Sequence, residues 1–223
     1  MNSIVMAAGE GLRLRPLTER WPKPVLPIDG RPVIATLLRE LRAGGISAAV
    51  VVTGHLAEEV ERLVGDGSAF GVDVTYVRQP QPDGSADAVR CALEATQAPV
   101  LVAAADTVFT PGSIAQFLRE WGDAPGAVAA RRGQPESGVK PNFEPRLARV
   151  LGEGLTNVPL WGIGAELVPF LDDLPGPPYE LAEAFQRAVD AGLTIAGIEI
   201  GKTRDLTSPV DLVKENFPYL GSR

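Results

Sequence analysis

The sequence predicts an α/β protein, a three-layer sandwich with a mostly parallel central sheet. Two observations predict this fold class. Short apolar runs alternate along the chain with amphipathic stretches, which is typical of a parallel sheet covered by helices. The run Val100–Ala105 is apolar without interruption, as expected of a central strand buried on both faces.

The first hundred residues show this alternation most clearly. In Val33–Ala43 the apolar residues recur at helical spacing, the charged residues lie opposite them, and Gly44-Gly45 supplies a stop signal. The same argument places strands at Ser3–Ala8, Ala48–Thr53, Asp73–Val77 and Val100–Ala105, and helices at Val33–Ala43, Ala57–Val64 and Ser85–Ala95.

The later part of the chain has a looser pattern. Thr110 can cap a helix whose first residue is Pro111, and Ser208 with Asp211 has the capping signature of a last helix. Because no repeat, low-complexity tract or linker is visible, we expect one domain over residues 1–223. Between the two caps we expect strands at Leu147–Leu151, Asn157–Ile163 and Thr194–Ile198, and a helix at Pro178–Ala191.

Composition and charge exclude several classes of protein. The net charge of −7 and the pI of about 4.9 argue against a general nucleic-acid binder. The apolar runs are shorter than the roughly 20 residues of a membrane span, and no signal peptide is visible, so we expect a cytoplasmic protein. The single cysteine, Cys91, excludes an internal disulfide framework. The single histidine, His55, has no nucleophile beside it in the sequence, so we expect a structural histidine.

The loop after the first strand is the most informative segment. Gly9 and Gly11 follow the strand directly and let backbone N–H groups approach an anion closely. Arg13 adds a planar donor fork for phosphate, and Lys23 adds a compact positive charge. Residues 1–31 hold five basic and three acidic side chains, whereas the remainder is strongly acidic. A locally basic loop on an acidic body indicates a phosphate site.

This loop resembles the signature of the sugar-phosphate nucleotidyltransferases, or NDP-sugar pyrophosphorylases. The resemblance runs from Gly9 to Thr18 and continues in Pro22-Lys23-Pro24. The chain is similar to the short forms, which lack a C-terminal β-helix domain, and the resemblance implies a Rossmann-like fold. It also implies that Arg13 and Lys23 are catalytic and bind the nucleotide phosphates, in a loop formed with Ala8, Gly9 and Gly11.

Three further segments resemble the family and imply further roles. Gln79 and Gly84 match the stretch that recognises the base. Asp106, at the end of an apolar run, and Asp205 match the two aspartates that hold the cofactor, Mg²⁺. Two carboxylates far apart in sequence are a normal way to bind this ion, with phosphate oxygens and water as its other ligands.

The acceptor side departs most from the family pattern. Gly138 and Asn157 match residues that approach the acceptor, so residues 131–163 are expected to form an acceptor-side subregion. The Glu-Lys-Pro triplet of the family, whose lysine binds the acceptor phosphate, is not visible here. Lys140 is our preferred replacement, with Arg146 and Arg149 as the other basic residues in this segment.

The resemblance implies transfer of a nucleoside monophosphate from an NTP, a pyrimidine nucleotide being favoured, to a sugar 1-phosphate. Pyrophosphate would be released and an NDP-sugar formed. Two alternatives stay open: a cytidylyltransferase for a non-sugar phosphate such as phosphocholine or inositol phosphate, and a nucleotide-binding regulatory domain without turnover. The implied partners are an NTP and a phosphorylated small molecule, with no nucleic acid and no membrane. The sequence leaves a homo-oligomer open.

Overall fold

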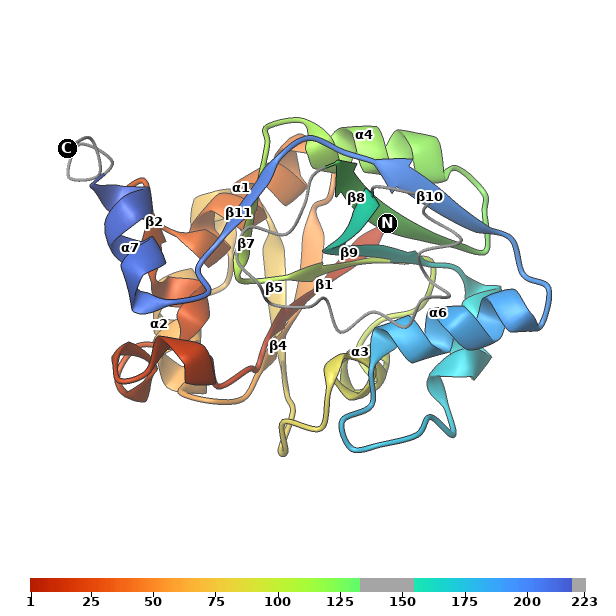
Figure 1. Cartoon of the computed structure of the whole chain (residues 1–223), viewed down its shortest axis with the longest axis horizontal. Coiled ribbons are helices and arrows are strands. Elements are labelled where there is room, and N and C mark those ends of the chain that lie inside the picture. The colour runs from red at the N-terminus through yellow and green to blue at the C-terminus, as the bar shows by residue number, and fades with distance from the viewer. Residues whose placement is uncertain (133–154, 218–223) are drawn as a thin grey trace.

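A computed structural model of the chain describes residues 1–132 and 155–217. Its centre is a seven-stranded sheet with the spatial order β10-β8-β9-β6-β1-β4-β5 (Figure 1). The strands of this sheet are β1 (Asn2–Ala7), β4 (Ala48–Thr53), β5 (Asp73–Arg78), β6 (Val100–Ala104), β8 (Gly126–Arg132), β9 (Leu155–Ile163) and β10 (Ile195–Glu199).

The sheet is mostly parallel, as the sequence predicts. β5, β4, β1 and β6 run parallel to one another, and β8 runs parallel to β10. β9 lies between β6 and β8 and is antiparallel to both. From β1 the chain moves outward to β4 and β5, and then returns to β6 on the other side of β1. The carboxyl ends of β1 and β6 therefore form a topological switch point, where open α/β sheets bind ligands.

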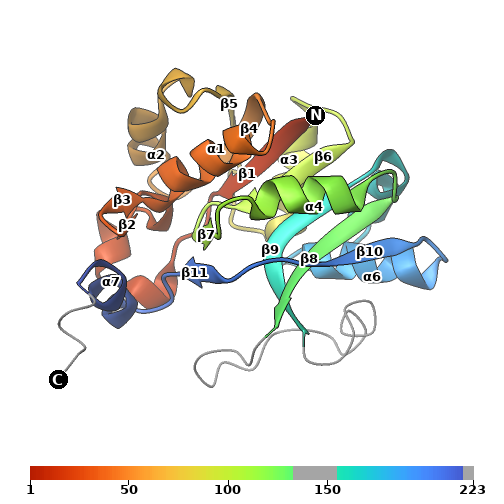
Figure 2. The ribbon, with the colours of Figure 1, turned by 90° about the horizontal axis from the view of Figure 1, so that it is seen from above.

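Helices cover both faces of the sheet, which confirms the three-layer arrangement. α1 (Val33–Ala43) and α4 (Ser113–Trp121) lie on one face, and α3 (Ser85–Leu93) and α6 (Leu181–Asp190) lie on the other (Figures 1 and 2). Side chains alternate along each strand, so Val5 joins the first apolar core and Ile4 joins the second. No helix in the described parts of the chain is long and apolar enough to cross a membrane.

α1 shows how the local sequence determines an element. Val33, Ile34, Leu37, Leu38 and Leu41 are all buried, and the helix has the bounds that the periodicity predicts. The observed bounds of α2 (Ala57–Val64) and of β4 are also those predicted. The remaining short elements are the 3-10 helices η1 (Leu12–Leu14), η2 (Leu17–Glu19), η3 (Lys23–Val25), η4 (Ser68–Phe70) and η5 (Ala165–Leu171).

Two small sheets and the last helix extend the fold on the side of the Gly-rich loop. The hairpin of β2 (Pro27–Ile28) and β3 (Arg31–Pro32) ends this loop, and β7 (Thr107–Phe109) pairs antiparallel with β11 (Thr203–Asp205). α7 (Pro209–Asn216) begins with the predicted capping box of Ser208 and Asp211. Asn216 Nδ2 donates to Pro27 O at 2.8 Å, which ties α7 to the hairpin.

Some predicted boundaries are wrong. α4 begins at Ser113 after Gly112, two residues beyond the predicted first residue Pro111, because Gly112 adopts a left-handed conformation (φ 87°) that interrupts the chain there. β8 was not predicted, since its seven residues combine small apolar and basic side chains without a clear period. The predicted strand Leu147–Leu151 lies outside the described residues.

Candidate functional site

A cleft of about 670 Å³ opens at the carboxyl ends of β5, β1 and β6, at the switch point of the sheet. It brings together side chains and backbone from segments far apart in the sequence. Among its lining residues are Ala8, Gly9, Gly11, Arg13, Lys23, Gln79, Gly84 and Asp106, all of which the sequence had indicated. The positions of the predicted loop, base and metal residues thus converge on one cavity, apart from Asp205.

The Gly-rich loop is held by contacts that require its glycine and threonine. Gly11 has φ 63°, a left-handed conformation that favours glycine, and a Cβ there would lie 2.9 Å from Thr18 Cγ2. Thr18 Oγ1 donates to Gly11 O at 3.0 Å, and the His55 ring Nε2 lies 2.7 Å from Thr18 O. His55 therefore stabilises the loop through Thr18, and the prediction of a structural histidine agrees with these contacts.

Arg13 is exposed, lines the cleft, and makes no hydrogen bond or ion pair with the part of the chain that the structure describes. Its neighbour Arg15 differs, since Arg15 pairs with Glu10 at 3.3 Å. Gly9 also borders the cleft, and a Cβ built on it would meet nothing within 4 Å. The Gly9 backbone, which no side chain covers, and the Arg13 guanidinium, which has no partner among the described residues, both face the cleft. This arrangement suits the binding of an anion.

Lys23 and Asp106 form an ion pair in the cleft. Lys23 Nζ donates to Asp106 Oδ2 at 2.5 Å, and Thr107 Oγ1 donates to Asp106 Oδ1 at 3.1 Å. Burial alone would raise the pKa of Asp106, but the Lys23 ammonium and the hydrogen bonds outweigh it and hold the pKa of this carboxyl below its usual range. Asp106 is thus kept as a carboxylate.

The backbone of Asp205 lies close in space to that of Asp106, because the pairing of β11 with β7 places Asp205 opposite Thr107. Its side chain is exposed, accepts from Thr207 Oγ1 at 3.0 Å, and is not part of the cleft lining, although Leu206 and Thr207 are. The described residues contain no group of three or more potential metal ligands. The two carboxylates are nevertheless hard oxygen donors that suit Mg²⁺, provided that phosphate oxygens and water supply the remaining ligands.

Gln79 and Gly84 lie together, and the structure gives a reason for the glycine. Gly84 has φ 108°, and a Cβ there would lie 2.3 Å from Tyr179 O. Glycine is therefore required here by the close approach of the Tyr179 backbone, and Ala86 N also donates to Tyr179 O at 2.9 Å. Gln79 is buried, and its amide nitrogen donates to Gly84 O at 3.1 Å.

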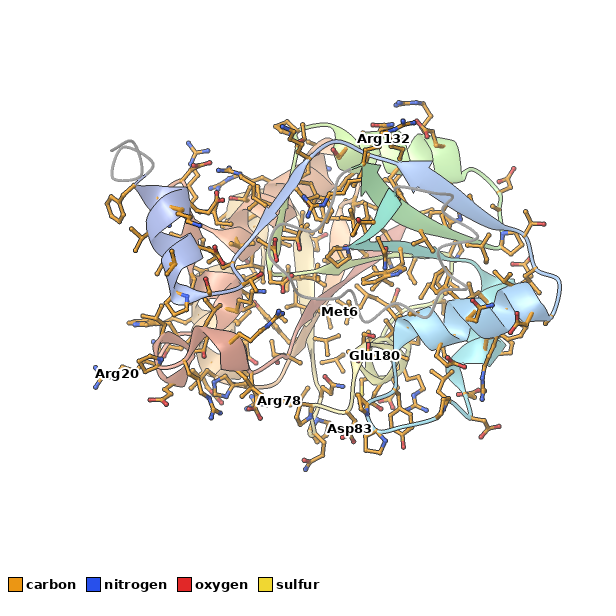
Figure 3. All side chains as sticks on the ribbon, in the orientation of Figure 1. Met6, Arg20, Arg78, Asp83, Arg132 and Glu180 are labelled. Carbon is orange, nitrogen blue, oxygen red and sulfur yellow. The ribbon has the colours of Figure 1, made fainter. Side chains whose placement is uncertain are left out.

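Glu180 is a cleft residue that the sequence analysis missed. Ser85 Oγ donates to Glu180 Oε2 at 2.5 Å and accepts from Leu181 N at 2.9 Å, so the start of α6 is joined to the start of α3. Glu180 and Met6, both labelled in Figure 3, line the cleft. The only signal in the sequence is an acidic residue at the start of a helical pattern, and 95 residues separate it from Ser85.

Of the predicted acceptor-side residues, Asn157 lies in the part of the chain that the structure describes. Gly138 and Lys140 lie outside the described residues, as do Arg146 and Arg149. Asn157 lies in β9, three residues from Leu160, which pairs with Ala103 of β6, itself three residues from Asp106. Asn157 is therefore at the same end of the sheet as Asp106. Its Oδ1 is buried and has no hydrogen-bond partner among the described residues.

The sequence profile of the nucleotidyl transferase family matches residues 2–133, which include the loop, Gln79, Gly84 and Asp106. The chain belongs to this family. A low-salt glycan biosynthesis nucleotidyltransferase of Haloferax volcanii is 40% identical over 93 residues, 41% of this chain and 26% of that protein. A glucose-1-phosphate thymidylyltransferase of Streptomyces antibioticus is 42% identical over 89 residues, 40% of this chain and 25% of that protein. The chain thus matches about a quarter of the length of these nucleotidyl transferase relatives.

Other comparisons extend over more of the chain. A CMP-5'-(3-aminopropyl)phosphonate synthase of Streptomyces rubellomurinus is 35% identical over 141 residues, 62% of this chain and 22% of that protein. A solved UDP-glucose pyrophosphorylase from Acinetobacter baumannii has a TM-score of 0.77 at 20% identity and covers 96% of this chain and 92% of that one. At this identity the likeness to the solved structure shows the fold alone.

Proposed function

We propose that this protein transfers a nucleoside monophosphate from an NTP to a sugar 1-phosphate, releasing pyrophosphate and forming an NDP-sugar. One observation carries this proposal: Arg13 and Lys23 of the Gly-rich loop line one cleft at the switch point of the sheet together with Asp106, 83 residues after Lys23. The family assignment and the thymidylyltransferase named among the relatives support the same class of reaction.

The proposed chemistry needs no general base. A phosphomonoester acceptor has a second pKa of about 6, so its attacking oxygen is largely ionised at neutral pH. The protein's contribution is then in-line alignment and stabilisation of charge on the transferred phosphate and the departing pyrophosphate. Arg13 supplies a guanidinium that no described residue engages, and the ammonium of Lys23 has further N–H donors beyond the one on Asp106.

Asp106 and Asp205 are the residues that we propose to hold Mg²⁺. When bound, this cation would neutralise charge on the nucleotide phosphates. The ion pair between Lys23 and Asp106 gives both residues a defined place before any ligand binds. Lys23 therefore orients the carboxylate and also remains within reach of phosphate oxygens in the cleft.

For the base we propose a pyrimidine, contacted by Gln79. Gln79 supports this role because it is the polar side chain that directly follows β5 and borders the cleft. For the acceptor phosphate we propose Lys140, with Arg146 or Arg149 as substitutes, because a phosphate dianion in a partly dry cleft needs a positive partner. Alanine at Lys140 should then raise the KM for the acceptor more than the KM for the NTP.

A second candidate is transfer to a phosphorylated acceptor that is not a sugar. The match to the CMP-phosphonate synthase favours it, since that similarity extends over 62% of the chain. The absence of the Glu-Lys-Pro triplet between Gly138 and Asn157 agrees with an unusual acceptor. The two candidates share the nucleotide half of the cleft and differ in the acceptor.

A pyrophosphate-release screen tests both candidates. ATP, GTP, CTP, UTP and dTTP are each combined with sugar 1-phosphates, phosphocholine, inositol phosphates and an alkylphosphonate, with Mg²⁺ present. We expect the fastest release of pyrophosphate with a pyrimidine nucleotide and a sugar 1-phosphate. Release with the other acceptors alone would establish the second candidate. Nucleotide binding without release in any combination would instead indicate a regulatory domain.

A further inference from the structure

The orientation of the Gln79 amide is determined by two acceptors behind it. Gln79 Nε2 lies 2.8 Å from Asp87 Oδ2 and 3.1 Å from Gly84 O. A carbonyl oxygen and an ion-paired carboxylate can only accept hydrogen bonds, so the NH₂ group of the amide must face them. The opposite orientation would place the amide oxygen against two other oxygens. Both N–H groups of Gln79 are therefore used within the protein.

Asp87 is itself held in place and is not part of the cleft lining. It lies on the first turn of α3, and Arg90 donates to Asp87 Oδ1 at 3.0 Å. The Arg90 guanidinium lies 4.9 Å from the centre of the Tyr179 ring, which adds a cation–π contact. One oxygen of Asp87 thus binds Arg90 and the other binds Gln79, so the carboxylate is fixed from both sides.

From this juxtaposition we propose that Asp87 is a positioning residue for nucleotide specificity. By binding the NH₂ group of Gln79, it leaves the amide oxygen Oε1 as the group that Gln79 offers to the cleft. Gln79 then accepts a hydrogen bond from an N–H on the base, such as N3–H of uracil or thymine, and does not donate to a base carbonyl. This inference rests on the proposed function, because it takes the cleft at Gln79 to be the base site.

A glutamine side chain can recognise a base in two ways, and the contacts of Gln79 distinguish them. A free glutamine amide offers both a donor and an acceptor, and could pair with a base N–H and a neighbouring base carbonyl together. Here the donor half is already satisfied, so a base carbonyl must find its donor elsewhere. The base affinity that Gln79 supplies is therefore expected to depend on a single N–H.

Nucleotide binding without acceptor tests the proposal independently of turnover. The best-binding NTP of the five in the screen is compared with its analogue methylated at the hydrogen-bonding N–H, 3-methyl-dTTP in the case of dTTP, by calorimetry. Three variants are measured beside the wild type: Asp87→Ala, Asp87→Asn, and Glu94→Ala as a control at the exposed end of the same helix.

We expect the wild type to bind the methylated analogue at least about tenfold more weakly, as for one lost hydrogen bond. Asp87→Ala should lower the affinity for the parent NTP about tenfold. It should also reduce the loss of affinity that methylation causes, because the Gln79 amide can then rotate. Asp87→Asn keeps an oxygen for Gln79 Nε2 and should stay within about threefold of the wild type. Base contacts are the same in the ground and transition states. The KM of Asp87→Ala for the NTP should therefore change, while its kcat and its KM for the acceptor should not.

The proposal is overturned if Asp87→Ala binds the parent and methylated nucleotides as the wild type does. It is also overturned if Asp87→Ala and Asp87→Asn lose affinity equally, because the ion pair with Arg90 would then carry the effect. A wild type that shows the expected binding pattern but releases no pyrophosphate would contradict the proposed function alone. A wild type that binds no nucleotide would contradict both.

Discussion

Lys23 Nζ and Asp106 Oδ2 lie 2.5 Å apart, although 83 residues separate them in the chain. The contact joins the end of the Gly-rich loop to the end of β6, across the switch point of the sheet. Each charge is thus compensated within the protein before a ligand arrives, which reduces the cost of holding either one in a partly buried cleft. The proposed phosphate contact and the proposed metal ligand form one electrostatic unit.

Removing either proposed phosphate contact should impair turnover strongly. We expect Arg13→Ala and Lys23→Ala each to lower kcat/KM by at least about 100-fold, because a charge-assisted contact to the reacting phosphates is worth on the order of 3 kcal/mol. Arg15→Ala is the matched control, since Arg15 lies in the same loop but pairs with Glu10. Steady-state pyrophosphate release measures all three, and near-normal turnover of the Arg13 or Lys23 variant would remove that residue from the mechanism.

Replacing Asp106 tests the proposed metal site. Asp106→Asn keeps the shape of the side chain but removes the negative charge that a hard cation requires. We expect this variant to lose activity at every Mg²⁺ concentration while still binding NTP, as measured by turnover and by calorimetry. Activity of the wild type in excess EDTA would contradict the metal role of both Asp106 and Asp205.

Gly84→Ala should damage the fold. The residue has φ 108°, and the added Cβ would meet the Tyr179 backbone at 2.3 Å, which cannot move as a side-chain end could. We expect a loss of at least about 2 kcal/mol in the free energy of unfolding, typical of strain at a special backbone conformation. Urea unfolding measures it. Unchanged stability would show that the Tyr179 segment can move away from α3.

Gly9→Ala should leave the stability of the fold unchanged and weaken NTP binding. A Cβ at Gly9 meets no protein atom within 4 Å, so the free energy of unfolding should stay within about 0.5 kcal/mol of the wild type. The methyl group would border the cleft where we propose the phosphates to bind, and NTP affinity should fall. Calorimetry and urea unfolding on the same preparation separate the two effects. Equal NTP affinity would place the phosphates away from Gly9.

The capping box of α7 should give a pH-dependent contribution to stability. Burial alone would raise the pKa of Asp211, but hydrogen bonds from Ser208 and Thr207 outweigh it and lower this pKa from its usual value. A lowered pKa in the folded state means that the contribution is present above the unfolded value of about 4 and is lost as the pH falls through the folded value. Asp211→Asn should cost about 1 kcal/mol at pH 7 and much less near pH 2. A cost that does not change between these pH values, in urea unfolding, would contradict this account.

Local sequence determined much of the fold by itself. The bounds of α1, α2 and β4 follow from apolar periodicity, and the capping box at Ser208 and Asp211 follows from residues three apart. Family resemblance in the Gly-rich loop likewise indicated Arg13 and Lys23 as site residues, and resemblance in further short segments indicated Gln79 and Asp106. The bounds of these helices and strands and the capping box depend on residues that are close in sequence, because the helix and strand periods determine which of those residues share a face.

The tertiary structure alone decided which of these residues meet and why some are needed. Gly84 is required by Tyr179, Ser85 bonds to Glu180, and Asp87 uses the donors of Gln79, none of which a local pattern expresses. Two of these three contacts join the start of α3 to residues about 95 positions later in the chain. Such contacts exist only once the strand order places α3 beside α6, because sheet order and packing, and not local propensity, bring distant segments together.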